Sequence, residues 1–425
     1  GLMGHPHQSD DIEVEKYFAV PGQDLVLRWL APEKDGLAGI DSTMAKCSAD
    51  AARLMHRRRN ANECFGACNK DDNPWQLSGG DIKWYTDWLA VRGVNLFIPH
   101  AFYYSIRGKR KDERPPDVGP HSIWWAHYEA WSTYWRRLSW LMTDIDLHAE
   151  AAVLCRNRDL CPDTVRPLFE RQIGFQYIPE SYFPACTVED GALCLHGHRY
   201  TAVLGDKALF PDAAHPEVSA LEPDCRCDPP QPMLRCAYFN KEGRACWLLV
   251  NEGNTPIKTR LTLPVDAPLC RYDLWNGQPC ACPAERTAKG ACLPLELPAR
   301  GSLLLFTCTA QESEALPLPP TYLSLAAPAF ALADEDAAHL TKTYRATLQI
   351  TATELQTATP LLTLPGQEMA ELTVNGQPAG VSFWPPHKFP LAGLLTPGEN
   401  TLTLTLTGSP ANRYGKHPVP YGLER

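Results

Sequence analysis

A short, nearly all-apolar run directly after a predicted helix constrains the fold more than any other feature of this sequence. Residues 78–93, SGGDIKWYTDWLAVRG, have helical spacing, begin at a Ser/Gly cap and end at Gly93. The run VNLFIP follows at once, and such a run is typical of a strand buried on both faces of a parallel sheet. Residues 122–144 are again helical in spacing. This order of helix, strand and helix is typical of a (β/α)8 barrel or a doubly wound sheet.

The preceding segment places a carboxylate at the end of another short strand. Helical spacing over residues 37–59, with Asp41 or Ser42 as the N-cap, leads into the run ANECFGA, which carries Glu63. Barrel enzymes collect their catalytic groups at the carboxyl ends of the strands. We therefore predict that Glu63 acts as a general acid or base. The alternative is a glutamate that caps a helix or pairs with an arginine at 57–59.

The end of the apolar run carries side chains suited to binding a sugar. His100, Tyr103 and Tyr104 follow it within PHAFYYS. Aromatic rings stack on the C–H faces of sugars, while imidazole and phenol groups bond to hydroxyls. We predict these three side chains, with Trp75 as a further stacking surface, as substrate contacts. The alternative is a structural histidine beside core aromatic residues.

The N-terminal stretch HPHQSDD gathers two histidines and two aspartates. His7 and Asp10 are predicted substrate contacts, and the group could also bind a divalent cation. Two closely spaced histidines do not complete a zinc site without distant ligands. The alternative is a solvated loop.

Length, charge and cysteine content exclude several classes of protein. A chain of 425 residues is too long for one ordinary domain. The net charge of -9 argues against nucleic acid or an anionic membrane as partner. The 16 cysteines contain no CxxC pair, so we read most of them as buried thiols of a cytoplasmic protein. The start GLMGHPHQSDD does not have the pattern of a signal peptide. It resembles the middle of a chain, so we expect the sequence to be part of a longer protein.

The rest of the chain changes from mixed to all-β patterning. Residues 151–230 are predicted to form a small α/β segment followed by a Pro-rich linker. Residues 231–312 and 313–425 show alternating strands with turn signals, including an Asn-Gly hairpin turn in AELTVNGQPAG, and predict two β-sandwiches.

Several long motifs resemble the family 106 glycoside hydrolases, the α-L-rhamnosidase-like enzymes. They cover residues 5 to about 145 and are HPHQSDDIEVEKYFAVPGQDLVLRW, NECFGA, DIKWYTDWLAVRGVNLFIPHAFYYSIRG and ERPPDVGP…WW. The segment AELTVNGQPAGVSFWPPHKFPLAGLLTPGENTLTLTLTGSPAN is similar to the jelly-roll sugar-binding domain that accompanies family 2 and related glycosidases.

The resemblance implies a (β/α)8 barrel followed by accessory β domains. It implies hydrolysis of a glycosidic bond by two carboxylates in an inverting reaction, with calcium near the sugar. Glu63, in the matching NE motif, would be one carboxylate, and Asn62 would contact the sugar. His100, Tyr103 and Tyr104 would line the subsite.

Two departures from the family pattern matter. Residues 1–150 cannot hold eight βα units, because a whole barrel needs roughly 250 residues. We therefore predict that 1–150 is the last part of the barrel and that the partner carboxylate lies upstream of Gly1. Asp10, Asp11 and Asp81 are the nearest local substitutes. The loop after ECFGA is also longer and more acidic than in the family, which bears on specificity.

The predicted function is hydrolysis of α-L-rhamnosides or related plant glycosides. On a late barrel strand Glu63 would be the base, whereas the Asn-Glu pattern of retaining β-glycosidases would make it the acid/base. The alternatives are a non-catalytic carbohydrate-binding or scaffolding fragment and a family 2-like β-glycosidase. Because exposed barrel strands invite pairing, we also expect self-association or an edge covered by residues 151–230.

Overall fold

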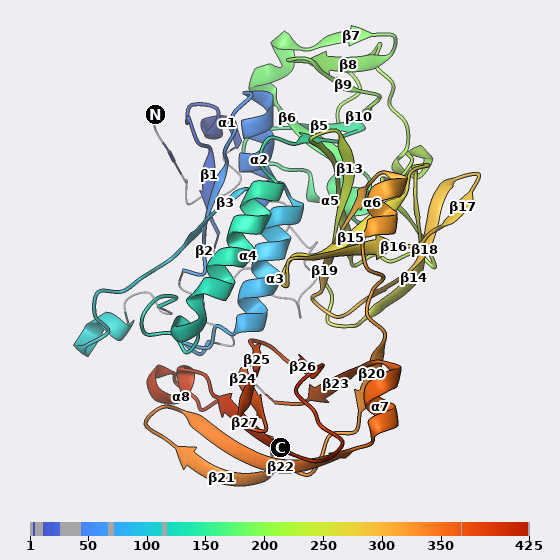
Figure 1. Cartoon of the computed structure of the whole chain (residues 1–425). Helices are drawn as coiled ribbons and strands as arrows, with labels where there is room; N and C mark the ends of the chain where they lie inside the picture. Colours follow the sequence, from blue (N-terminus) through green and yellow to red (C-terminus); the bar gives the residue numbers. More distant parts are fainter. Residues whose placement is uncertain are drawn as a thin grey trace. The chain divides into compact units, whose positions relative to one another are not determined.

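A computed structural model describes residues 3–4, 12–25, 44–66, 72–112, 117–366 and 368–423. In this part the chain mixes α/β and all-β regions, as predicted (Figure 1). It forms two compact units, each assembled from segments that are distant in sequence. The first contains Gly1–Cys64, Trp84–Pro99 and Glu129–Leu318, and the second contains Phe65–Lys83, His100–Tyr128 and Pro319–Arg425.

The first unit begins with a parallel sheet of βα type. Its described strands pair in the order β1 (Gly22–Asp24), β2 (Ala61–Cys64) and β3 (Leu96–Pro99). Parallel neighbours need crossover helices, and the helices in this region are α1 (Ile12–Glu15), α2 (Ala45–Leu54), α3 (Gly79–Val91) and α4 (Tyr128–Leu141). Helices α3 and α4 lie side by side in Figure 1, where Trp135 Nε1 donates to Thr86 Oγ1 at 3.1 Å.

Local sequence sets both ends of α3, as predicted. The backbone N–H of Asp81 donates to Ser78 Oγ at 3.1 Å, while the Asp81 carboxylate accepts from the Ser78 backbone N–H at 3.1 Å, a reciprocal cap. At the other end Gly93 has φ +98° and the N–H of Val94 donates to the carbonyl of Leu89 at 3.1 Å. This is the pattern of a glycine C-cap. The predicted N-caps of the preceding helix, Asp41 and Ser42, lie outside the described residues.

A second parallel sheet and an antiparallel meander follow. The sheet has the order β10 (Ala202–Leu204), β5 (Ala151–Cys155), β6 (Phe175–Pro179), and α5 (Pro162–Glu170) connects β5 to β6. The meander consists of β7 (Thr187–Glu189), β8 (Ala192–Leu195) and β9 (His198–Tyr200). Its turns contain Asp190–Gly191 and His196–Gly197, all at positive φ.

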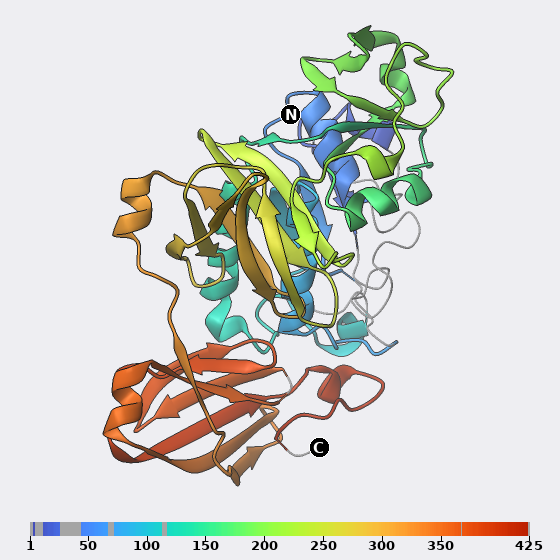
Figure 2. The same cartoon turned by 90° about the vertical axis from the view of Figure 1, so that its right-hand side faces the viewer.

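Two antiparallel sheets form a sandwich in the same unit (Figure 2, yellow to ochre strands). One has the order β16 (Gln278–Cys282), β15 (Leu269–Asp273), β19 (Ser302–Thr307), β13 (Arg244–Asn251), β12 (Leu234–Lys241), β4 (Asp146–Leu147). The other has the order β11 (Arg226–Asp228), β14 (Ile257–Leu263), β18 (Gly290–Leu297), β17 (Glu285–Thr287). Their inner faces share one core, in which Trp247, Leu303 and Leu305 of the first sheet pack with Leu261 and Leu293 of the second.

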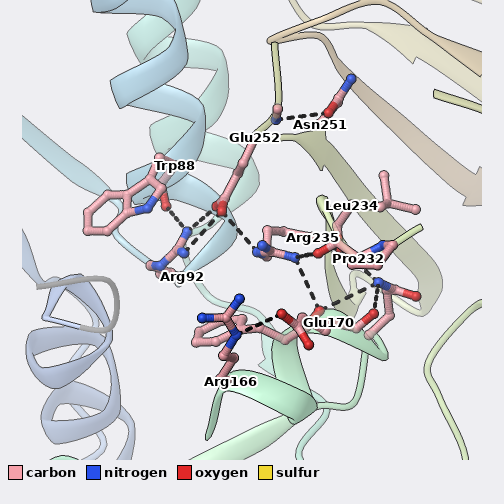
Figure 3. Close-up of polar contacts among 12 residues, drawn as sticks. Trp88, Arg92, Arg166, Glu170, Pro232, Leu234, Arg235, Asn251 and Glu252 are labelled. Carbon is pink, nitrogen blue, oxygen red and sulfur yellow. Dashed lines mark hydrogen bonds and ion pairs between the residues drawn. The ribbon is translucent and has the colours of Figure 1, made fainter. Parts of the chain in front are cut away.

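A buried ion cluster joins the helical part of this unit to the sandwich (Figure 3). Glu252, just after β13, accepts from Arg92 of α3 at 2.5 Å and from Arg235 of β12 at 2.9 Å. The three side chains are at most 1% exposed. Arg92 also donates to the carbonyl of Trp88 at 3.0 Å, and its guanidinium lies 4.2 Å from the Trp88 ring centroid. The carboxylate offsets two buried cations, because an unpaired charge in the interior is costly.

The second unit contains a further β-sandwich. One sheet has the order β21 (Ala331–Asp336), β22 (Thr341–Ile350), β27 (Gly398–Thr407), β24 (Met369–Val374), β25 (Gln377–Ser382), and the other β20 (Tyr322–Leu325), β23 (Thr359–Leu364), β26 (His387–Pro390). Their core includes Leu372 and Leu404 with Leu362 and Phe389. The β24–β25 hairpin turns on Asn375–Gly376 with φ of +51° and +78°, as predicted. This unit also contains the short helices α7 (Ala352–Thr357) and α8 (Ala411–Tyr414), whereas α6 (Ala310–Ala315) belongs to the first unit.

The fifteen described cysteines are free thiols, and nine of them are buried: Cys47, Cys64, Cys155, Cys225, Cys246, Cys270, Cys282, Cys292 and Cys308. None of the described helices has the length and apolar character needed to cross a lipid bilayer.

Candidate functional site

The parallel sheet places two carboxylates on neighbouring strands. Asp24 is the last residue of β1, Glu63 lies near the carboxyl end of β2, and the two are Cα partners in the register. Partners in a parallel register share a face of the sheet. Asp24 is 8% exposed and Glu63 is partly exposed. Two acidic side chains therefore lie together at the end of the sheet where α/β enzymes carry their chemistry.

Backbone pairing fixes this end of the sheet. The N–H of Leu25 donates to the carbonyl of Glu63 at 3.1 Å, and Glu63 is also in register with Ile98 of β3. Two of the three arginines that the sequence offered as partners for Glu63 have other contacts. Arg58 pairs with Asp144 at 2.8 Å, and Arg59 donates to Thr143 Oγ1 at 2.8 Å.

Asn62 occupies the opposite face of β2. It is in register with Gln23 and Phe97, and both amides are fully buried. Within the described residues neither Oδ1 nor Nδ2 of Asn62 has a hydrogen-bond partner. Strand alternation therefore separates Asn62 from Glu63, although the two are adjacent in the sequence.

In the second unit, the segment after β3 brings His100 and Tyr103 together. Their rings meet edge to face with centroids 6.4 Å apart. Gly66 leaves room for the imidazole, because a Cβ atom at this position would lie 3.2 Å from His100 Cγ. His100 and Tyr103 are both partly exposed. The phenol ring of Tyr103 and the imidazole of His100 are groups that can bind a hydroxylated ligand.

Asp117 organises the same segment and was not identified from the sequence. Its buried carboxylate accepts from the backbone N–H groups of Tyr103 at 3.2 Å, Gly119 at 2.7 Å and His121 at 3.0 Å. It also bonds to His121 Nδ1. One side chain thus holds three backbone groups around Tyr103. The signal that could have revealed it is the turn sequence DVG after two prolines, since Asp commonly bonds to the backbone two residues ahead.

The remaining candidates in the second unit lie in different environments. Trp75 is 1% exposed, donates to the carbonyl of Lys111 at 2.9 Å and packs against Tyr414 with ring centroids 5.1 Å apart. Its ring faces are therefore occupied within the protein. Tyr104 is 96% exposed. Asp81, named as a substitute carboxylate, is buried as the cap of α3. His7, Asp10 and Asp11 lie outside the described residues.

The described residues do not fit the calcium ion that the family resemblance implies. They contain no group of three or more His, Cys, Asp or Glu side chains placed to hold a metal ion. Calcium takes six to eight oxygen ligands, and Asp24 with Glu63 supply only two side chains.

Asp24 is the second residue that sequence reasoning missed. It ends the short run GQD after Pro21, and Glu63 likewise lies close to the end of a short strand before a loop. The strand itself is only three residues long, so periodicity could not reveal it. The sequence signal for Asp24 was its similarity to Glu63, since each is a carboxylate at or near the end of a short run that follows a turn.

Comparison with known proteins gives matches to solved structures of glycoside hydrolases. No family model and no curated protein match the sequence. A solved rhamnosidase from Novosphingobium sp. PP1Y superposes with a TM-score of 0.69 at 14% identity, covering 95% of this chain and 48% of that chain. A GH42 β-galactosidase variant from G. stearothermophilus has a TM-score of 0.44 at 10% identity, covering 72% of this chain and 63% of its own. The β-galactosidase from Bacillus circulans sp. alkalophilus has a TM-score of 0.43 at 10% identity, with 70% and 62% covered.

The first match establishes the architecture. The chain has a rhamnosidase-like glycoside hydrolase fold, in agreement with the resemblance read from its motifs, and it spans about half, 48%, of the solved rhamnosidase. The two β-galactosidases are too distant to support a structural argument.

Proposed function

We propose that this chain belongs to a glycoside hydrolase that cleaves α-L-rhamnosides or related plant glycosides, with Glu63 as a catalytic carboxylate. The position of Glu63 near the carboxyl end of β2, with Asp24 beside it in register on β1, carries the proposal. The rhamnosidase-like fold over 95% of the chain supports it. Hydrolysis of a glycosidic bond needs two carboxyl groups. In this proposal β1, β2 and β3 are late strands of a (β/α)8 barrel, and the final sandwich is of the jelly-roll type.

The reaction in this proposal inverts the anomeric centre. One carboxylic acid protonates the leaving oxygen, while Glu63 takes a proton from the attacking water. Inverting pairs stand about 6.5–9.5 Å apart to leave room for that water, and retaining pairs about 5–5.5 Å apart. Because neighbouring strands are only about 4.8 Å apart, the acid of an inverting pair would come from an element other than β1. Asp24 then positions Glu63 or a sugar hydroxyl.

Sugar recognition is assigned to the residues that the sequence singled out. His100 and Tyr103 contact hydroxyls, and the exposed ring of Tyr104 stacks on the substrate. Asp117 holds the backbone around Tyr103 in the form that binding requires. Asn62, His7 and Asp10 remain proposed substrate contacts, although Asn62 would have to act from the face opposite Glu63. The buried ring of Trp75 supports its loop.

The test is hydrolysis of 4-nitrophenyl α-L-rhamnopyranoside by the unmodified chain and by Glu63→Gln. The matched control is Glu189→Gln, which changes an exposed glutamate on β7. We expect kcat to fall by about 10²–10⁴-fold in Glu63→Gln, the usual contribution of a general acid or base. The control should retain full activity. The anomer released first, followed by proton NMR, distinguishes an inverting from a retaining reaction.

The other functions are separate outcomes of this experiment. Equal turnover by the unmodified chain and Glu63→Gln would remove Glu63 from the mechanism. Turnover of 4-nitrophenyl β-galactoside or β-glucuronide in preference to the rhamnoside would indicate a family 2-like β-glycosidase. Binding of rhamnose without turnover of any glycoside would indicate a carbohydrate-binding or scaffolding role.

A further inference from the structure

A cavity of about 580 Å³ lies between helix α4 and the six-stranded sheet of the first unit. This volume is within the range of about 300–1,000 Å³ that small-molecule sites occupy. The helix contributes Arg136 and Trp140, and the sheet contributes Arg244, Tyr272 and Phe306. None of the residues proposed for glycoside hydrolysis lines this cavity, so it is a separate feature of the molecule.

Because side chains alternate between the two faces of a strand, the residues of this sheet that do not face the sandwich core line the cavity. On β19, Leu303 and Leu305 pack into the sandwich core, whereas Leu304 and Phe306 point to the other face and line the cavity. On β13, Trp247 is likewise in the core, while Cys246 faces the cavity. The cavity therefore occupies the outer face of a sheet whose inner face is already packed.

The walls suit a planar, apolar ligand. The rings of Trp140, Tyr272 and Phe306 line the space together with Leu141, Leu274, Leu304 and Pro279. Trp140 is 59% exposed although it lies beside this apolar surface. A sugar would lose hydrogen bonds to water against such walls without gaining replacements, which is costly. An aromatic ring system would stack on the rings and displace water from the leucines.

The rim carries an excess of positive charge. Arg136, Arg137, Lys241 and Arg244 line the cavity against one lining carboxylate, Glu242. Arg244 is paired with Glu312 at 2.6 Å. Lys241 donates to the carbonyls of Trp140 at 3.1 Å and Thr143 at 2.5 Å, at the end of α4. Arg137 donates to the carbonyls of Leu274 and Trp275.

Arg136 is the cation available to a ligand. It donates to the neutral hydroxyl of Thr133 at 2.9 Å, and no carboxylate of the described residues lies within 4.0 Å of it. A guanidinium binds a carboxylate through two parallel N–H···O bonds, and these charge-assisted bonds are strong and directional. We propose that this cavity is a binding site for an aromatic carboxylate, whose rings stack on Trp140, Tyr272 and Phe306 and whose carboxylate bonds to Arg136.

The test measures binding of 2-naphthoate to the full chain by isothermal titration calorimetry. The variant Arg136→Gln removes the proposed charge partner, and Arg57→Gln makes the same change at an exposed arginine outside the cavity. Trp140→Ala removes a stacking surface that is largely exposed, so the variant should fold. We expect saturable binding that weakens roughly tenfold in Arg136→Gln and in Trp140→Ala, but not in Arg57→Gln.

A neutral ligand separates charge recognition from hydrophobic binding. We expect 2-naphthylmethanol to bind the unmodified chain roughly tenfold more weakly than 2-naphthoate and to be insensitive to Arg136→Gln. The proposal is overturned by equal affinity of the acid and the alcohol, or by unchanged affinity for 2-naphthoate in both cavity variants. Absence of saturable binding at millimolar 2-naphthoate also overturns it. Circular dichroism confirms that each variant is folded before its affinity is compared.

Discussion

At the residue scale, Glu252 is the carboxylate on which two buried guanidinium groups depend (Figure 3). Removing its charge takes away the carboxylate to which both Arg92 and Arg235 bond in the interior. We expect Glu252→Gln to lower the free energy of unfolding by about 3–5 kcal/mol, the usual cost of breaking a buried ion pair from one side. Urea unfolding followed by tryptophan fluorescence measures the change.

The control for this substitution is Glu296→Gln. Glu296 pairs with Lys258 at 3.0 Å, but the two side chains are 68% and 72% exposed. An exposed pair contributes about 0–1 kcal/mol, so this variant should unfold close to the unmodified chain. A similar loss of unfolding free energy in both variants would show that the buried cluster stabilises the fold no more than an exposed ion pair does.

His387 predicts a loss of stability in acid. It is fully buried on β26, and burial lowers its pKa to about 4 from an ordinary value of 6.5. Between these values the unfolded chain binds a proton that the folded chain does not. The stability is therefore complete above pH 6.5 and is lost as the pH falls toward 4, by up to ~3 kcal/mol.

The measurement is urea unfolding of the unmodified chain and of His387→Gln at several pH values from 7.5 to about 4.5. A glutamine does not titrate, so the variant should lose less stability over this range. His339→Gln is the control, because His339 is 77% exposed beside Asp336. An identical pH dependence in all three proteins would assign the acid sensitivity to other groups.

At the element scale, Gly93 determines where α3 ends. The residue has φ +98°, and a Cβ atom there would lie 2.9 Å from the Cβ of Ala49 on α2. We expect Gly93→Ala to destabilise the chain by about 2–4 kcal/mol, because it combines backbone strain with a steric clash.

The matched substitution is Gly243→Ala in the β12–β13 turn. Gly243 has φ +80°, and an added Cβ would meet no atom within 4 Å. This variant should show backbone strain alone, about 1 kcal/mol. Thermal unfolding of the two variants side by side measures the contribution of the packing between α2 and the end of α3. Equal losses of stability in the two variants would mean that α2 moves away from the added methyl group at residue 93 without an energetic cost.

At the scale of the whole molecule, segments far apart in the sequence form the second unit. Asn73, 3% exposed, donates to the carbonyl of His417 at 2.9 Å and accepts from the N–H groups of Lys416 at 2.8 Å and His417 at 3.2 Å. These bonds join the segment after β2 to the C-terminal end of the chain. Because the Asn73 side chain is buried and makes three hydrogen bonds to the backbone, we expect it to stabilise the position of the segment after β2.

We expect Asn73→Ala to cost about 1–3 kcal/mol and to make residues 72–83 more sensitive to limited proteolysis. Under the proposed function it should also raise KM for the rhamnoside while Glu63 remains intact. The control is Asn276→Ala, in an exposed turn where the amide bonds only locally to Asp273. Unchanged proteolysis of Asn73→Ala would show that other contacts hold the segment.

The sequence alone determined the features that depend on neighbours along the chain. The caps of α3 at Ser78 and Gly93, and the hairpin turn at Asn375–Gly376, follow from the preferences of a few adjacent residues. The mixed α/β and all-β organisation follows from hydrophobic periodicity. The same local logic placed Glu63 near a strand end, and long motifs indicated the rhamnosidase-like fold.

Tertiary structure decided everything that depends on register and on distant contacts. Asp24 meets Glu63 only because β1 and β2 pair in one register, and Asn62 lies on the opposite face for the same reason. Arg92 and Glu252 are 160 residues apart, and Asn73 and His417 are 344 apart. Local propensities contain no information about such pairs, because the burial that makes them form is a property of the assembled chain.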